Sequence, residues 1–201
     1  MEPNEVHVLH LLARLAKQFR HYEISRSILA NFIETRPADV AMGLDYIRAL
    51  VAGKKFQEAL EQCERVLGIT PENIEIYGLK AEVLYNLGRF EEAIAIYRAL
   101  SELPDRRALS LLHLGKALKT VGDTDQAIAH FHQAMNEHAA PAQAYWELAS
   151  LKTYAFSEDE IEGMRQRLKA AGGAAMDKVL LNFSLGKAME DQRQWADSFA
   201  H

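Results

Sequence analysis

The feature that most constrains this chain is a pair of short amphipathic helices that recurs every 34 residues. One copy runs from Ile74 to Leu103, with Gly88 at the bend between its helices and Pro104 directly after it. Small, aromatic, glycine and proline positions recur at this interval as Ala59, Ala93 and Ala127; Cys63, Tyr97 and Phe131; Gly88 and Gly122; Phe56 and Phe90; and Pro37 and Pro71. A period of this length predicts helical hairpins that bury their apolar faces against one another.

The residue types at the recurring positions fit such hairpins. Small residues are expected where two helices cross, because a larger side chain would hold them apart. The facing pairs are predicted to join Ala81 or Gly115 on the first helix to Ala93 or Ala127 on the second. The aromatic residues Tyr97 and Phe131 are predicted to fill the groove between one hairpin and the next. The prolines mark unit boundaries, because proline lacks an amide donor and restricts the residue before it.

With these positions in one register, the chain resembles the tetratricopeptide repeat, a helix-turn-helix solenoid unit. The resemblance implies an all-α, right-handed superhelix of antiparallel helix pairs. Residues 1–140 are predicted to form four such hairpins. Residues 141–201 are predicted to continue the same solenoid as an irregular fifth hairpin and a truncated sixth repeat.

Composition restricts the compartment and the partners. The chain has 201 residues, 49% of them hydrophobic, which is enough for a sizeable core. Its net charge of −5 gives no reason to expect nucleic acid as a partner. Cys63 is the only cysteine and is predicted to be a buried packing residue in a reducing compartment. The start MEPNEVHVLH has no secretory pattern, and no apolar run has the ~20 residues that cross a bilayer. We therefore predict a cytoplasmic protein with no membrane partner.

The region after Pro141 departs from the regular period. Ser157 and Glu160 predict a capping box at the start of a helix that runs to about Ala170 and stops at Gly172-Gly173. A further helix, Asp177 to Asp191, repeats the LGKA sequence of the fourth unit.

A partner helix is predicted to begin at Trp195, and the sequence then stops at His201 before that helix is complete. The chain therefore looks cut. Such an end would expose the apolar face formed by Leu181, Leu185 and Met189. We expect self-association through this C-terminal hairpin, or poor order in the last residues.

The C-terminal part resembles a narrower family. AYWELASLKTYAFSEDEIEGMRQRLKA followed by LLNFSLGKAMEDQRQWADSFAH is similar to the junction segment of bacterial tetratricopeptide-repeat sulfotransferases. In those proteins a repeat array precedes a sulfotransferase domain whose strand, loop and helix hold phosphoadenosine phosphosulfate. No loop of that kind follows an apolar strand in this sequence. The chain itself is thus predicted not to be an enzyme, with no catalytic residue and no cofactor.

The sequence gives little support for a metal site or for an acid–base pair. The histidine groups, His7 with His10 and His130 with His132 and His138, lack a carboxylate or cysteine that would complete a metal site. We interpret them as surface imidazoles and predict no metal. Acidic clusters such as Glu91-Glu92 stand at helix starts, where they complement the helix dipole.

What remains for function is the inner surface formed by the first helix of each hairpin. The predicted concave face is mostly basic with two aromatic residues, and consists of His10, Arg14, Lys17, Arg48, Glu82, Tyr85, Lys116, Lys119, Trp146 and Lys187. Such a face could hold an extended, partly acidic segment of a protein. The alternative is that these are ordinary solvated side chains.

Two functions remain open. One is the binding arm of a sulfotransferase, which recruits or orients a peptide or protein. The other is a free-standing adaptor in complex assembly, secretion or surface-polymer assembly. A co-chaperone clamp for a terminal carboxylate is disfavoured, because Asp45, Glu75 and Leu79 or His113 stand where that clamp needs other residues.

Overall fold

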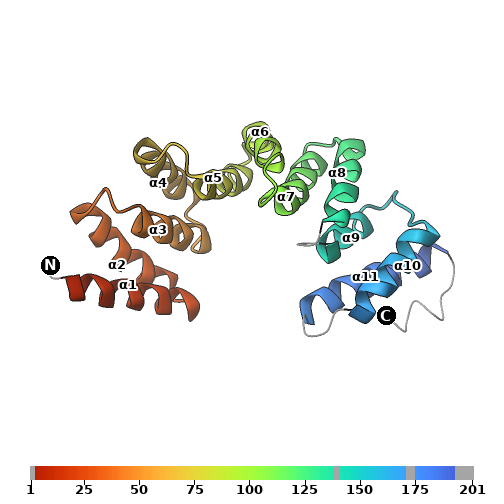
Figure 1. The fold of residues 1–201 in the computed structure, drawn as a ribbon, viewed down its shortest axis with the longest axis horizontal. Helices are drawn as coiled ribbons and strands as arrows, with labels where there is room; N and C mark the ends of the chain where they lie inside the picture. The colour runs from red at the N-terminus through yellow and green to blue at the C-terminus, as the bar shows by residue number, and fades with distance from the viewer. Residues whose placement is uncertain (1–2, 138–140, 171–174, 193–201) are drawn as a thin grey trace. The chain divides into compact units, whose positions relative to one another are not determined.

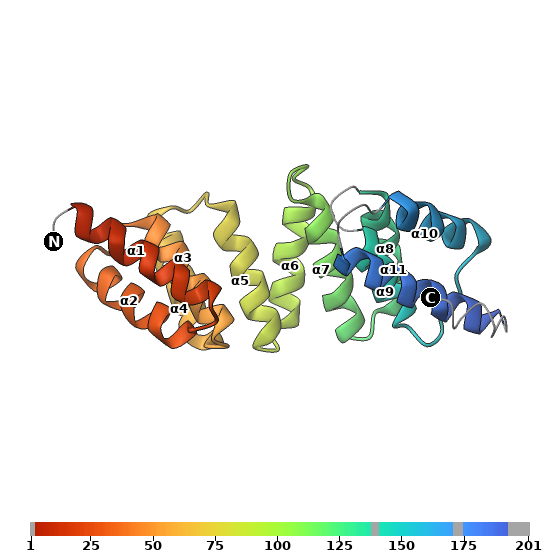
Figure 2. The same ribbon diagram turned by 90° about the horizontal axis from the view of Figure 1, so that it is seen from below.

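The computed structural model describes residues 3–137, 141–170 and 175–192, and all its regular elements are helices. The chain divides into two compact units, Met1–Ile96 and Tyr97–His201, with the boundary inside α6. The helices, shown in Figures 1 and 2, are α1 (Pro3–Gln18), α2 (Tyr22–Thr35), α3 (Val40–Ala52), α4 (Phe56–Ile69), α5 (Ile74–Asn86), α6 (Phe90–Ser101), α7 (Arg107–Thr120), α8 (Thr124–Asn136), α9 (Pro141–Ala149), α10 (Glu158–Ala170) and α11 (Ala175–Asp191).

Within each unit, consecutive helices form antiparallel pairs that pack in series. In the first unit α1 packs on α2 and α3 on α4, and the second helix of each pair also contacts the next first helix, as α2 does α3 and α4 does α5. In the second unit α7 packs on α8, α8 on α9, and α11 on both α9 and α10. This arrangement confirms the predicted all-α solenoid class. The grouping of 1–140 as four hairpins and 141–201 as an irregular continuation stays a prediction.

Side-chain caps set the starts of α3 and α5. Asp39 accepts a hydrogen bond from the amide of Met42 at 3.1 Å, and Asn73, one period later, accepts one from Ile76 at 3.2 Å. These caps satisfy amides that have no partner within the first turn of α3 and α5. Each follows a boundary proline by two residues, so the end of one hairpin and the start of the next lie close together in the sequence.

The turns inside the hairpins share one backbone conformation. Gly88 and Gly122 have positive φ angles of 78° and 90°, and Arg20 and Lys54 have φ angles of 63° and 58° at the same repeat position. In each turn the next residue bonds back across the helix end, as the amide of Lys55 does to Leu50 at 2.8 Å. This bond closes a helix end only when the residue before it is left-handed. The first two hairpins therefore use a cation where the next two use glycine.

The helix crossing in the fourth hairpin differs from the prediction. A Cβ atom added to Gly115 would lie 2.5 Å from the ring of Phe131, so the ring, and not Ala127, is the nearest group to this glycine. Phe131 thus packs against Gly115 inside its own hairpin, and the expectation that it fills the next groove stays a prediction. Tyr97 does contact the following hairpin, because its ring stacks on His113 of α7 at 5.3 Å. The glycine is needed to admit a phenylalanine at the crossing.

The irregular region begins as predicted. Glu160 accepts hydrogen bonds from the amide and hydroxyl of Ser157 at 2.8 and 3.0 Å, and its own amide donates to the Ser157 hydroxyl at 3.4 Å. The capping box is therefore confirmed. Tyr154 joins this group, since its hydroxyl lies 2.5 Å from Glu160 and 2.7 Å from His132 of α8. These bonds fix the segment between α9 and α10 that replaces the usual turn.

The prediction that Leu181, Leu185 and Met189 form an exposed face on α11 is wrong. Leu181, Leu185 and Met189 are buried, because this side of α11 packs on α9 and α10. Met176 and Phe183 are exposed instead. The predicted partner helix from Trp195, the Gly172-Gly173 stop and His138 lie outside the described residues.

Candidate peptide-binding surface

In the first unit, the first helices meet around a buried carboxylate, Asp45 of α3. It is 2.5 Å from Nε2 of His10 on α1, and it accepts a hydrogen bond from Nη1 of Arg48, one turn further along α3, at 2.9 Å. Arg48 also donates to Glu75 of α5. We call these four residues the Asp45 cluster. It joins three successive first helices through side chains that point to the same face.

The electrostatics of Asp45 follow from this geometry. Burial opposes its ionisation, but hydrogen bonds from His10 and Arg48 and the nearby charge of Lys17 outweigh burial. The pKa of Asp45 therefore lies below its usual value, and the carboxylate is charged at neutral pH. The same residue holds the Arg48 guanidinium in place and helps to raise the pKa of that group.

The remaining predicted residues of this unit stand on α1 and α5, two of the helices that carry the cluster. Arg14 is exposed on α1, and Lys17 is half-buried one turn later. Glu82 is exposed on α5, and the half-buried ring of Tyr85 packs edge-on against Phe90 with 5.4 Å between centroids. The first unit therefore presents exposed charges of both signs around its Asp45 cluster.

The second unit buries a carboxylate in the same way. Glu147 of α9 is 4% exposed and is bonded by Lys119 of α7, with Nζ of Lys116 3.7 Å from its other oxygen. Lys119 also donates to the hydroxyl of Ser150 at 3.1 Å. We call these four residues the Glu147 cluster. Trp146, next to it in the sequence, is 37% exposed on α9.

Lys187 is not part of this cluster. Its ammonium group bonds to Asp191, one turn later on its own helix α11. The structure thus brings together His10 with Arg48 in one unit and Lys116 with Lys119 in the other, whereas Lys187 is satisfied locally.

Sequence reasoning missed the two buried acids. Asp45 and Glu147 occupy the same repeat position, three periods apart, with Leu79 and His113 at the positions between them. The signal was a charged residue in a register that elsewhere holds an apolar or aromatic side chain. From the sequence alone, Asp45 and Glu75 stand out only as departures from a chaperone clamp.

The cations of the two clusters keep hydrogen-bond donors beyond those used within the clusters. Lysine has three donors and arginine five, so the bonds to Asp45 and Glu147 leave donors for a further carboxylate. Cys63 is buried, and burial raises the pKa of its thiol to about 12, so it is no nucleophile. Over the ranges 3–137, 141–170 and 175–192, no three metal-ligating side chains gather, and no helix is long and apolar enough to span a bilayer.

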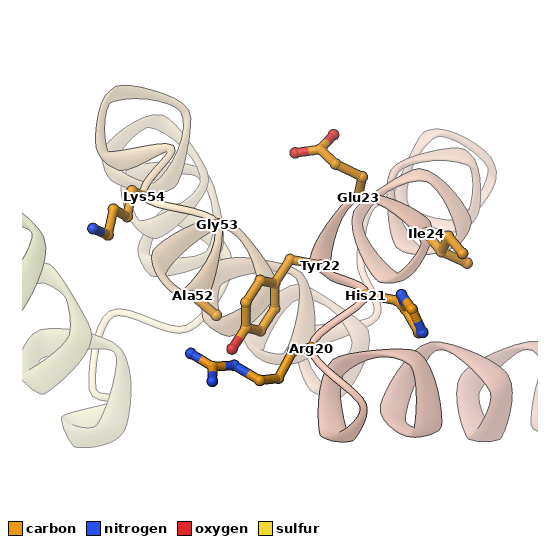
Figure 3. Close-up of a pocket in the computed structure, with 8 residues that line it drawn as sticks. All are labelled: Arg20, His21, Tyr22, Glu23, Ile24, Ala52, Gly53 and Lys54. Atoms are coloured by element: carbon orange, nitrogen blue, oxygen red, sulfur yellow. The ribbon is translucent and has the colours of Figure 1, made fainter.

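A separate open depression of about 430 Å³ lies between the turns of the first two hairpins. Arg20, Tyr22 and Lys54 are among the residues that line it. Figure 3 shows the Arg20 side chain beside the Tyr22 ring, while the side chains of His21, Glu23 and Lys54 point in different directions. The polar groups do not converge on one point, so this depression is a weaker candidate than the two clusters.

Comparison with known proteins agrees with the helix pairs. Residues 10–74 and 50–114 match family models described as tetratricopeptide repeat. An uncharacterized protein of Sinorhizobium fredii, y4yS, is 34% identical over 93 residues, which are 45% of this chain and 51% of that protein. Human DnaJ homolog subfamily C member 7 is 30% identical over 99 residues, which are 49% of this chain and 20% of that protein. The chain therefore spans about half of the first relative and a fifth of the second.

Solved structures show the same fold at low sequence identity. A structure of pilF from Pseudomonas aeruginosa superposes with a TM-score of 0.67 at 20% identity, over 96% of this chain and 87% of that one. The protein TTC0263 from Thermus thermophilus gives 0.64 at 17% identity, over 89% and 98%. These likenesses establish the fold of the chain.

Proposed function

Since this chain is built of tetratricopeptide repeats, we propose that it is a protein-binding scaffold that holds an extended, partly acidic segment against its first helices. The observation that carries the proposal is the pair of ionic clusters. In each unit, cations on first helices are fixed by a buried carboxylate and remain partly exposed on their other side, as Arg48 and Lys119 are.

The anchoring favours binding because it reduces the entropy that a flexible cation would lose. A long side chain immobilised on binding costs about 0.5–1.5 kcal/mol. Arg48 is already held by Asp45 and Glu75, and Lys119 by Glu147 and Ser150. The internal acids also offset much of the positive charge. The surface therefore suits a segment with a few carboxylates among apolar residues, for which Trp146 offers a flat contact.

Peptide binding to charge-altered variants tests the proposal. The probe is a panel of short peptides that alternate Glu with Leu, with Gln-containing counterparts as neutral controls. Arg14→Glu in the first unit and Trp146→Ala in the second alter exposed side chains, so the fold should persist. We expect each change to weaken binding of the acidic peptides about 10-fold, because truncating an interface anchor costs roughly 1–2 kcal/mol.

Lys169→Glu on α10 is the matched control, since it reverses an exposed charge away from the first helices. Isothermal titration calorimetry in low and moderate salt gives the affinities. Equal weakening by the control, or equal affinity for Glu and Gln peptides, would contradict the proposal.

The finer proposal is that this scaffold is the non-catalytic arm of a longer bacterial sulfotransferase-type protein in the cytoplasm. Its support is the resemblance of residues 145–201 to the junction segment of those enzymes. The alternative is a free-standing adaptor, which the matches of residues 10–114 to repeat models fit equally well. Sequencing the gene beyond codon 201 separates them. A continuing frame with a strand, phosphosulfate loop and helix supports the arm, whereas a stop codon leaves the adaptor.

A further inference from the structure

The first helix carries an exposed apolar stripe. Val8, Leu12 and Leu15 are 54, 47 and 40% exposed, and Leu11 and Phe19 extend the stripe to the end of α1. Their spacing of three and four residues places them on one side of the helix. Five large apolar side chains exposed on one helix face form a patch of the kind that marks an interaction site.

The equivalent positions in later repeats show what kind of surface would fit this stripe. One period later, Val8, Leu12 and Leu15 correspond to Met42, Tyr46 and Ala49 of α3, which are buried. The corresponding residues of the second unit are also buried: Ser110, Leu114 and Ala117 of α7, then Ala144 and Leu148 of α9, and Leu151 just after α9. The second helix of the preceding hairpin packs on this kind of helix, as α2 does on α3 and α8 on α9, and Tyr46 of α3 interacts with Arg26 of α2. The stripe on α1 is therefore shaped to receive a helix.

A second stripe of the same kind lies on α11. Met176, Val179 and Phe183 are 66, 61 and 54% exposed, although α11 packs on α9 and α10 through its other side. Leu185-Gly186 repeats Leu114-Gly115 of α7, and Gly115 faces the second helix of its hairpin. Phe183 is three residues before Gly186 and shares its side of the helix. This stripe too lies where the fold elsewhere seats a helix.

Charge distinguishes between the ways in which the two stripes can pair. The helix α1 contains Glu5, Arg14 and Lys17, a net charge of +1, so two copies of α1 would repel each other. The described part of α11 carries Asp177, Glu190 and Asp191 against Lys178 and Lys187, a net charge of −1. The basic stripe of α1 is thus complementary to α11 and not to itself.

We propose that α1 of one copy of this chain packs against α11 of a second copy. Each helix then fills the place where the other lacks a covering helix among the described residues. The contact joins different surfaces of the two copies, so it either closes into a ring or continues into larger assemblies as concentration rises. This assembly extends the self-association expected at the C-terminal end and does not depend on peptide binding.

Two single variants and their mixture test the pairing. Leu12→Glu places a charge in the α1 stripe, and Phe183→Glu places one in the α11 stripe. Leu109→Glu on α7 is the matched control, because Leu109 is 49% exposed outside both stripes. Sedimentation velocity over a wide concentration range gives the mass, and far-UV circular dichroism checks the fold. If a glutamate variant unfolds, Leu12→Ser or Phe183→Ser replaces it.

We expect the unaltered chain and Leu109→Glu to gain mass with concentration, and each stripe variant alone to stay monomeric. An equal mixture of the two variants should form a dimer and nothing larger. The intact α11 of Leu12→Glu can pair with the intact α1 of Phe183→Glu, and the two altered stripes are then left without a partner. A monomeric unaltered chain, assembly of either stripe variant alone, a monomeric mixture, or loss of assembly in Leu109→Glu would each overturn the proposal.

Discussion

The two compact units bury a carboxylate at the same repeat position but hold it differently. Asp45 is bonded by His10 from the preceding first helix and by Arg48 from its own helix. Glu147 depends on lysines that both come from the preceding first helix, α7. In both clusters a donor on one first helix bonds to an acid on the next first helix. An acid is therefore tolerated at this register when the neighbouring helix supplies its partner.

Because Glu147 is more deeply buried than Asp45, the Glu147 cluster is the more sensitive of the two to the loss of a cation. The side chain of Glu147 is 5% exposed and that of Asp45 is 11% exposed. A more deeply buried carboxylate loses more hydration and relies more on its partners. We therefore expect the loss of one cation to destabilise the second unit more than the first.

The largest expected effect is that of Lys119→Met. It removes the direct bond to Glu147 and leaves Lys116 at 3.7 Å, so we expect a loss of about 2–3 kcal/mol, somewhat less than for a fully broken buried pair. Arg48→Met should cost about 1 kcal/mol, because His10 still bonds Asp45 in a more exposed site. Urea unfolding measures both.

A double variant provides the control. Glu147→Leu combined with Lys119→Met removes the buried charge along with its partner, and Leu79 shows that leucine occurs at this repeat position. Most of the lost stability should return. Equal losses of stability for Lys119→Met and Arg48→Met would show that the two clusters depend equally on a single cation.

The hairpin turns offer a second contrast, between cations and glycines. Lys54 has a φ of 58°, whereas Gly122 has the same left-handed conformation without a Cβ atom. Lys54→Gly and Arg20→Gly are each expected to raise the free energy of unfolding by about 0.5–1 kcal/mol. Gly122→Ala should lower it by a similar amount.

Lys55→Gly is the control for the turn, since Lys55 follows Lys54 directly and has a φ of −89°. It should bring no gain in the same urea titration. A stabilisation by Lys55→Gly as large as that by Lys54→Gly would mean that the left-handed backbone is not the cause.

The sequence predicted the helix pairs well because their small, aromatic and proline positions recur in one register. The sequence showed the turn directly at Gly88 and Gly122, but Lys54 and Arg20 are recognised there only by counting one and two periods back from Gly88. The buried acids could not be inferred, because a charged residue on an amphipathic helix is expected on the solvated side unless its partner on another helix is known.

The exposed face of α11 was mispredicted for a related reason. LGKA recurs in α11 at an interval that is three residues longer than two periods, because the segment between α9 and α10 replaces the regular turn. Which side of α11 meets α9 and α10 therefore depends on the path of that segment. The Tyr154, His132 and Glu160 bonds that fix this path join residues far apart in the repeat pattern, and periodicity gives no information about them.

The smallest expected effect concerns pH and the residue between the two acids, His113. It shares their repeat position and stacks on Tyr97, and burial together with the charge of Lys116 lowers the pKa of its imidazole from the usual 6.5. A lowered pKa means that the folded chain binds this proton less readily than the unfolded chain. The stability contributed is thus fully present above about pH 6.5 and is lost as pH falls through the lower folded-state pKa.

His113→Leu should therefore flatten the fall in unfolding free energy between pH 7 and pH 5. His130, whose pKa burial also lowers, keeps part of the slope. His7→Gln, which removes an exposed histidine from the first unit, serves as the control. Because protonated His113 would lie near Lys116 of the Glu147 cluster, the protection of amides against exchange, relative to the unfolded chain at the same pH, should fall at low pH in α7 before it does in α3. Protection that falls first in α3 would place the acid-sensitive element in the Asp45 cluster instead.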